Sequence, residues 1–333
     1  MLLEYRFARS ALGLRQKHIT GPIIAGMLLF GCGQESSEVA IKQSESKANR
    51  VDLRITEEPN YSQDKMYEKM EIFTDYLRRQ TGLNIKYVPA INYSHAYELF
   101  ASGKVDLFWS GSLNTAKILN ADPDAKPIAI EEKSFANILL VNRQILNQVK
   151  AGLDSEKPLQ ALRGRNVVFG NSSSGSSFLT PLLEMKAQGV SLLDLRSCTH
   201  EQKHELRAMF LGDSDDQDFA FVPGTVDNPL QHVPPAARSE VLVGWASDKK
   251  RNNYILASSS LLKPSISPMV SQIQEALLAW NKDSQSNRQL LKDIWVTGFE
   301  LPNNKEDLKS VQEMKEFVKA LGSRTGCTSK KKS

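Results

Sequence analysis

The region from residue 51 to 120 alternates between strand-like and helix-like segments, and this alternation limits the possible folds most strongly. Strand patterns occupy residues 51–55, 84–89 and 105–109, and amphipathic helix patterns follow at 67–77, 93–100 and 114–120. Short connections between such units favour a mostly parallel sheet covered by helices, which is an α/β fold. Ligands of these sheets bind at the carboxyl ends of the strands.

A serine-rich segment lies at the carboxyl end of another buried strand, where that strand ends and a helix begins. Val167–Phe169 leads into a Gly170-Asn171 turn, and residues 172–177 then contain five serines and one glycine before a helix pattern begins at Phe178. Unpaired N–H groups and the positive end of the helix dipole meet there, so the segment is suited to hold an oxyanion. The alternative is a serine-rich helix cap on a surface loop. A shorter turn of this type, Ser110-Gly111-Ser112, follows the strand at 105–109.

The rest of the chain adds further strand and helix patterns. Strands are predicted at 128–130, 138–141, 218–222, 241–245 and 254–257, and helices at 269–281, 287–295 and 308–321. A length of 333 residues is sufficient for two domains.

The amino terminus resembles a bacterial lipoprotein signal. Arg6, Arg9, Arg15 and Lys17 precede an apolar run at 22–30 that is too short to span a bilayer, and the run ends at Gly31-Cys32. We expect residues 1–31 to be removed, Cys32 to carry lipid such as palmitate, and the polar residues 32–50 to form a tether. The alternative is an ordinary secretory signal with a coincidental cysteine.

Charge and cysteine content exclude other classes of function. Residues 1–31 carry four basic side chains and one acidic side chain. Without these residues the formal charge of the chain falls from +4 to about +1. A charge this small gives no argument for nucleic-acid binding. We predict no disulfide between Cys198 and Cys327, no metal site and no cofactor. Residues 323–333 are expected to form a disordered basic tail.

At this point the sequence resembles the substrate-binding lipoproteins of phosphate, phosphite and phosphonate ABC importers. The resemblance is carried in order by residues 75–93, 103–111, 159–181 and 295–299. It implies a two-lobed periplasmic binding protein fold of type II, with the ligand held in a cleft between the lobes. Lobe one would comprise residues 51–142 and 250–322, and lobe two residues 143–249.

The resemblance also implies ligand-binding positions, most of them in the two serine-containing turns. In the second turn Ser174 and Ser176 match the family pattern, whereas Gly175 and Ser177 stand at its threonine and glycine positions. In the first turn Ser110 replaces a tyrosine beside Gly111.

Two further positions outside the turns are implied by the resemblance, and the loop after residue 55 offers a third candidate. His200-Glu201 matches a histidine–glutamate step of the family, and Asp227 falls at a later acidic position. Glu57 could face the cleft and meet a ligand amine, as could its neighbour Glu58, although a solvated loop is the alternative.

These features together predict a binding protein and not an enzyme. The expected function is closure of a hinge around a phosphorus oxyanion and its delivery to an ABC permease and ATPase, by a monomer anchored on the periplasmic side of a bacterial membrane. Alternatives are a ligand-sensing receptor, or a clamp for a different small anion. A serine hydrolase using Ser174, His200 and Asp227 is disfavoured, because no Gly-x-Ser-x-Gly elbow is present.

Overall fold

The computed structural model describes residues 52–213, 217–225, 227–280 and 284–303, together with Asp307, Lys309, residues 311–314 and Glu316. All of them belong to one compact unit that begins at Arg50. The predicted signal, the lipidation site Cys32, the tether and the basic tail lie outside the described residues. Only part of the helix predicted at 308–321 is described, and those residues are helical.

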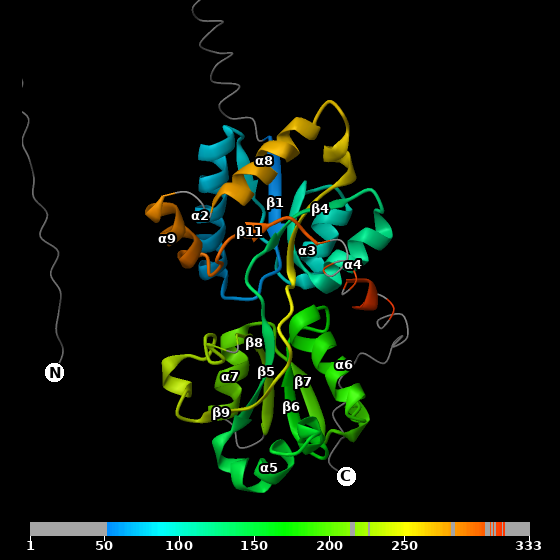
Figure 1. The fold of residues 1–333 in the computed structure, drawn as a ribbon, viewed down its shortest axis with the longest axis vertical. Coiled ribbons are helices and arrows are strands. Elements are labelled where there is room, and N and C mark those ends of the chain that lie inside the picture. Colours follow the sequence, from blue (N-terminus) through cyan, green and yellow to red (C-terminus); the bar gives the residue numbers. More distant parts are fainter. Residues whose placement is uncertain are drawn as a thin grey trace, which may run out of the picture. The chain divides into compact units, whose positions relative to one another are not determined.

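The first lobe is built on a six-stranded sheet with the order β11-β4-β10-β3-β1-β2. Its strands are β1 (Leu53–Glu57), β2 (Ile85–Tyr87), β3 (Leu107–Gly111), β4 (Lys126–Glu131), β10 (Asn253–Ala257) and β11 (Phe299–Glu300). Its helices are α2 (Gln63–Thr81), α3 (Tyr93–Ala101), α4 (Ser112–Ala121), α8 (Ser267–Ala279) and α9 (Gln285–Asp293). These elements occupy the upper part of Figure 1.

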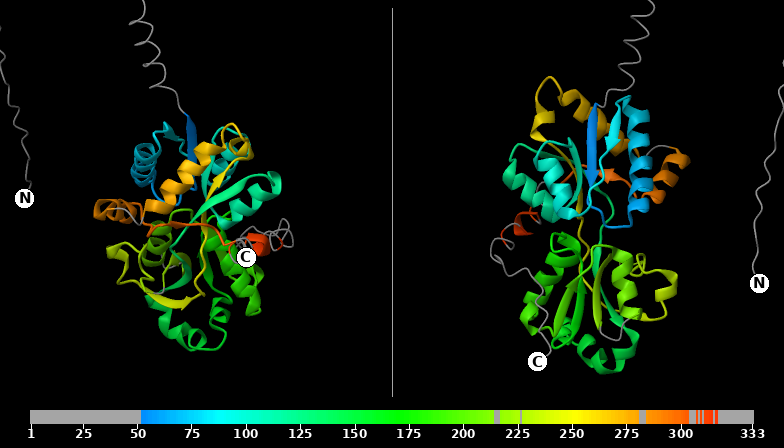
Figure 2. Two further views of the ribbon diagram at one scale, coloured as in Figure 1. Left: turned by 45° about the horizontal axis from the view of Figure 1, so that its top comes forward. Right: turned by 180° about the vertical axis from the view of Figure 1, so that it is seen from behind.

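The second lobe is built on a five-stranded sheet with the order β7-β6-β8-β5-β9. Its strands are β5 (Ala136–Asn142), β6 (Asn166–Phe169), β7 (Ser197–His200), β8 (Phe219–Gly224) and β9 (Val241–Ala246). Its helices are α5 (Leu146–Leu153), α6 (Thr180–Ala187) and α7 (His204–Asp213). Helices lie on both sides of each sheet in the views of Figure 2.

Both sheets are buried on both faces, as the alternation of side chains along each strand requires. On β5, Ile138 and Leu140 join one apolar cluster, whereas Leu139 and Val141 join the cluster on the opposite face. The pattern repeats on β3, where Phe108 faces away from Trp109.

The sheets are mixed rather than mostly parallel, which corrects one detail of the predicted fold. β1 is parallel to β2 and β3, but β10 is antiparallel to β3 and β4. In the second lobe β6 is parallel to its neighbours, whereas β5 is antiparallel to β8 and β9. The antiparallel strands β5 and β10 are those that the chain enters from the other lobe.

The boundary between the lobes lies before β5 and not after it. The sequence analysis assigns residues 136–142 to lobe one, but they pair within the second sheet. The chain therefore crosses between the sheets at residues 132–135 and returns at 247–252. The two crossing segments are joined where the Phe135 N–H donates to the Lys250 carbonyl at 2.9 Å and the Lys250 N–H donates to the Phe135 carbonyl at 2.8 Å.

Cys198, on the edge strand β7, is disulfide-bonded. The sequence analysis predicts no disulfide, and for Cys198 this prediction is wrong. Separation along the chain does not decide which segments meet in the fold, so it could not exclude such a bond.

Candidate functional site

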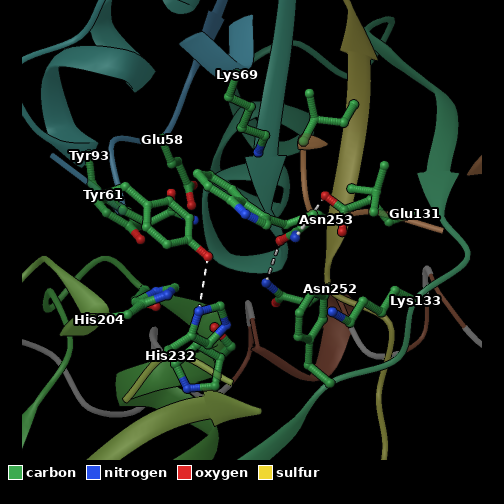
Figure 3. Close-up of a pocket in the computed structure, with 18 residues that line it drawn as sticks. Glu58, Tyr61, Lys69, Tyr93, Glu131, Lys133, His204, His232, Asn252 and Asn253 are labelled. Atoms are coloured by element: carbon green, nitrogen blue, oxygen red, sulfur yellow. Dashed lines mark hydrogen bonds between the residues drawn. The ribbon is translucent and has the colours of Figure 1, made fainter. Parts of the chain in front are cut away.

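A cavity of about 50 Å³ lies between the lobes, and side chains from both of them line it. The first lobe and the returning segment contribute Glu58, Asn60, Tyr61, Lys69, Tyr93, Glu131, Lys133, Asn252, Asn253, Ile294, Trp295 and Val296. Phe135, from the first crossing segment, and Ser174, Ser176, His204, Pro223 and His232 of the second lobe complete the lining. Figure 3 shows Tyr61, Tyr93 and Glu58 on one side of this cavity, with Glu131, Lys133 and Asn253 on the other.

The serine loop reaches the cavity because it joins β6 to the helical turn at Gly175–Leu179, which continues into α6. The Asn171 side chain accepts from the Ser173 N–H at 2.8 Å, and the Ser174 Oγ accepts from the Ser177 N–H at 3.1 Å. Ser174 therefore caps the helix and lines the cavity at once, while the half-buried Ser176 lines it beside Ser174. The two interpretations of the loop are compatible in this fold.

Two tyrosines of the first lobe extend the polar wall toward the serines. Tyr93, the first residue of α3, lines the cavity with Ser174, and burial raises its pKa, so it stays an O–H donor. The hydroxyl of Tyr61 lies 3.0 Å from the Nδ1 of His232 across the cleft. Both side chains are almost fully buried.

Two buried histidines line the second-lobe side. His204 is the first residue of α7, and its Nδ1 is buried without a hydrogen-bond partner. Burial lowers the pKa of His204 well below its usual range and the pKa of His232 to about 3. Both imidazoles are therefore neutral at physiological pH, and His204 can donate one N–H to a ligand. The His232 Nε2 accepts from the Gln231 side-chain amide at 2.9 Å, so the His232 N–H is on Nδ1 and is directed at the Tyr61 hydroxyl.

Buried carboxyls form much of the first-lobe wall. Glu58, which directly follows β1, accepts from the Asn114 amide at 2.8 Å, and burial raises its pKa to about 8. Glu131, at the end of β4, accepts from the Trp109 indole N–H at 2.8 Å, and burial raises its pKa to about 7. Glu57 forms a buried ion pair with Lys69.

Arg207 supports the serine loop from behind. It is 1% exposed, and its guanidinium donates to the Glu201 carbonyl at 3.0 Å and to the Ser177 Oγ at 3.3 Å. Burial lowers its pKa to about 10, so it remains charged. A positive charge beneath the loop favours an anion at the serines.

The structure places only two of the nine sequence-predicted ligand residues, Ser174 and Ser176, in the cavity lining. Gly175 and Ser177 are buried in the same loop behind them. Ser110 is buried and bonds Thr115 at 2.7 Å, and Gly111 packs behind Glu58.

The other three predicted residues are also absent from the lining of this cavity. The Nδ1 of the exposed His200 lies 2.7 Å from the Gly170 carbonyl oxygen, and Asp227 is exposed and pairs with Lys249. Glu57 is committed to its ion pair with Lys69, whereas its neighbour Glu58 reaches the cavity. Ser174, His200 and Asp227 therefore form no hydrogen-bonded triad.

Several lining residues were missed by the sequence analysis, above all Tyr61, His204 and Glu131. Tyr61 lies in the loop after β1 and Glu131 ends β4, so each stands near a strand end at the cleft. The rule that ligands bind at the carboxyl ends of strands identified the serine turns, and it could also have identified Tyr61 and Glu131.

The described part of the chain offers neither a clustered metal site nor a membrane-spanning helix. It holds no group of three or more histidine, cysteine, aspartate or glutamate side chains placed to bind a metal ion. Among its helices, none is both long and apolar enough to cross a bilayer.

Comparisons with known proteins agree on one family. The family model for the periplasmic phosphonate substrate-binding proteins of ABC transporters matches residues 55–308. A probable phosphite-binding protein of an ABC transporter, PhnD1 of Prochlorococcus marinus, is 28% identical over 143 residues. That match covers 42% of this chain and 47% of the relative, so it spans about half of the relative's length.

Solved structures are similar over most of the chain. PhnD1 of Prochlorococcus marinus in complex with methylphosphonate has a TM-score of 0.71 at 20% identity, covering 80% of this chain and 98% of that one. A binding protein component of an ABC phosphonate transporter from Pseudomonas aeruginosa has a TM-score of 0.62 at 14% identity, covering 82% and 97%. The two-lobed fold and the extent of the family match together show that this chain belongs to the periplasmic substrate-binding proteins of phosphonate ABC transporters.

Proposed function

We propose that this protein binds a small phosphorus oxyanion, such as phosphite or a short phosphonate, in the cavity between its lobes. The observation that carries the proposal is the convergence of serine and tyrosine hydroxyls and the neutral His204 imidazole on one largely buried cavity. Hydroxyl and N–H donors suit the oxygens of a tetrahedral anion. The size of the cavity, about 50 Å³, favours a compact ligand.

Closure of the two lobes is the proposed means of capture. Several hydrogen bonds already join the lobes around the cavity, including Tyr61 to His232 and the Lys117 Nζ to the Ser173 Oγ at 3.2 Å. A ligand that contacts both lobes would shift the equilibrium toward this closed arrangement. The closed form would then be recognised by the permease and ATPase of an ABC importer.

The amino-terminal segment completes the proposal. Lipid attached to Cys32 would hold the protein, as a monomer, at the periplasmic side of a membrane. Mass spectrometry of the membrane-extracted protein would reveal the expected mass increase at Cys32, and a Cys32→Ser variant would be released into the soluble fraction.

The binding proposal is tested by isothermal titration of a protein that starts after Cys32 with phosphite, methylphosphonate and sulfate. Ser176→Ala removes a hydroxyl that lines the cavity, and a hydrogen bond to a charged ligand contributes about 1.5–3 kcal/mol. We therefore expect Kd to rise by about ten- to hundredfold. Ser197→Ala is the matched control, because Ser197 lies on β7 and bonds Asn166. Absence of binding to both phosphorus oxyanions would refute the proposal.

A further inference from the structure

We propose that Glu58 retains its proton in the ligand complex and donates its O–H to an oxygen of the bound anion. The inference rests on the proposed function and adds a condition to it: binding requires a neutral carboxyl at position 58. Glu58 would then determine which charge state of the protein captures the ligand.

The position of Glu58 places it beside the oxyanion donors. Its side chain lines the cavity and is 8% exposed. Tyr93 and Ser174 line the same cavity as Glu58, and the Asn114 amide ties Tyr93 to Glu58: it donates to the Glu58 Oε1 at 2.8 Å and to the Tyr93 carbonyl at 3.3 Å. An anion at Ser174 and Tyr93 therefore lies close to the Glu58 carboxyl.

The hydrogen bonds of Glu58 are compatible with a protonated carboxyl. The Asn114 amide donates to its Oε1 at 2.8 Å, and the backbone N–H of Gly111 lowers the pKa of the same carboxyl. A carboxylic acid keeps acceptor capacity for such donors and gains one O–H to donate. In the closed cavity, an anion oxygen is the natural acceptor for that O–H.

The charges that face Glu58 do not supply a strong counter-ion. Glu57 on β1 repels a charge on Glu58, and the Lys69 ammonium next to Glu57 is already paired with it. The attraction by Lys117 on α4, whose Nζ lies 3.2 Å from the Ser173 Oγ, is the smallest of the influences on Glu58. Burial outweighs these effects and raises the pKa of Glu58 to about 8 in the ligand-free cavity, and a neighbouring anion raises it further.

Glu131 differs from Glu58 in its surroundings. It faces the Lys69 ammonium on α2 and accepts from the Asn253 amide at 3.0 Å. The Lys133 ammonium also attracts the Glu131 carboxylate. Cations on two sides stabilise an ionised Glu131, so Glu58 is the carboxyl we assign to the ligand.

The test compares wild type with Glu58→Gln, which keeps a donor and an acceptor but cannot ionise. Affinities for phosphite and methylphosphonate are measured by titration calorimetry from pH 6 to pH 9.5. Ionisation of the ligand itself cancels in the ratio of the two Kd values.

We expect the variant to bind within a few-fold of wild type at pH 6, and the ratio of wild-type to variant Kd to rise by up to about tenfold per pH unit above about pH 8. Glu98→Gln, on the exposed side of α3, is the matched control and should follow wild type.

The outcomes separate this inference from the proposed function. A Kd ratio that stays flat with pH, while both proteins bind, overturns the role of Glu58 and leaves the proposed function intact. Loss of binding in a folded Glu58→Gln protein, with wild type preferring 2-aminoethylphosphonate, also overturns it, because an ionised Glu58 would then bind the ligand ammonium. Failure of wild type to bind any of the phosphorus ligands at every pH refutes the proposed function instead.

Discussion

Lys69→Met is the perturbation whose effect on stability follows most directly from the structure. Lys69 is 5% exposed and Glu57 is 3% exposed, and the two form a buried ion pair beneath the cavity. The Lys69 Nζ also lies 3.8 Å from the centroid of the Trp109 ring. Methionine preserves the length and apolar volume of the lysine stem, so the variant mainly removes the charge.

The loss of folding free energy in Lys69→Met can be worked out from Glu57, the carboxyl that loses its counter-ion. Without Lys69, Glu57 is a buried carboxylate without its counter-ion, and burial already raises its pKa from 4.5. Holding it protonated at pH 7 against an unfolded-state pKa of 4.5 costs about 3 kcal/mol. This agrees with the roughly 3–5 kcal/mol found when one partner of a buried pair is removed. The cost should fall by about 1.4 kcal/mol per pH unit as pH decreases from 7 toward 5.

Urea denaturation of the ligand-free protein at pH 7 and pH 5 measures both effects. The double variant Glu57→Gln/Lys69→Met should recover most of the stability, because it leaves no buried charge. Lys65→Met is the control on the same helix: its pair with Glu205 is partly exposed and should cost under about 1 kcal/mol. A cost for Lys69→Met below about 1 kcal/mol at pH 7, or one that does not change at pH 5, would refute the reasoning.

Three more predictions concern the cavity and its supports. The raised pKa values of Glu58 and Glu131, about 8 and about 7, mean that the folded state holds protons that the unfolded chain has lost. His204 and His232, which stay neutral in the folded protein, act in the opposite direction below about pH 6.5, because the unfolded chain protonates them. The effect of Glu131 is therefore read as a difference: relative to wild type, Glu131→Gln should gain stability by up to about 1.4 kcal/mol per pH unit as pH rises from 5 to 7, measured by denaturation curves. Gly170→Ala would place a methyl group 2.3 Å from the nearest side-chain atom, so we expect a loss of about 1–3 kcal/mol, seen as a lower Tm. Tyr61→Phe removes the bond to His232 across the cleft, and calorimetry should show an affinity about fivefold lower with little change in the ligand-free Tm.

Local sequence patterns predicted the parts of the site that are themselves local. The strand, turn and capped helix around Ser174 follow from residues that are adjacent in the chain, so the serine loop was placed correctly at the cleft. The lobe boundary and the mixed sheets depend on which strands pair across long separations, and periodicity carries no information on pairing. The alternation of strands and helices predicted the α/β class, whereas the two-lobed arrangement was implied by the resemblance to the family.

The choice of histidine shows what sequence could not decide. His200 and His204 are four residues apart, and either fits a histidine–glutamate step. His200 ends β7, where its ring bonds the Gly170 carbonyl and stays exposed. His204 begins α7 and is buried against the cavity. The length of the turn between β7 and α7 decides which ring turns inward, and that length was not predicted.

The paired backbone bonds between Phe135 and Lys250 have a mechanical consequence. Two independent linkers would allow each lobe to twist, slide and bend with respect to the other. Because these two segments are tied side by side, rotation in one must be matched by the other, and the two form a short ribbon that bends as a unit. We therefore expect the relative motion of the lobes to follow mainly the bending of this ribbon.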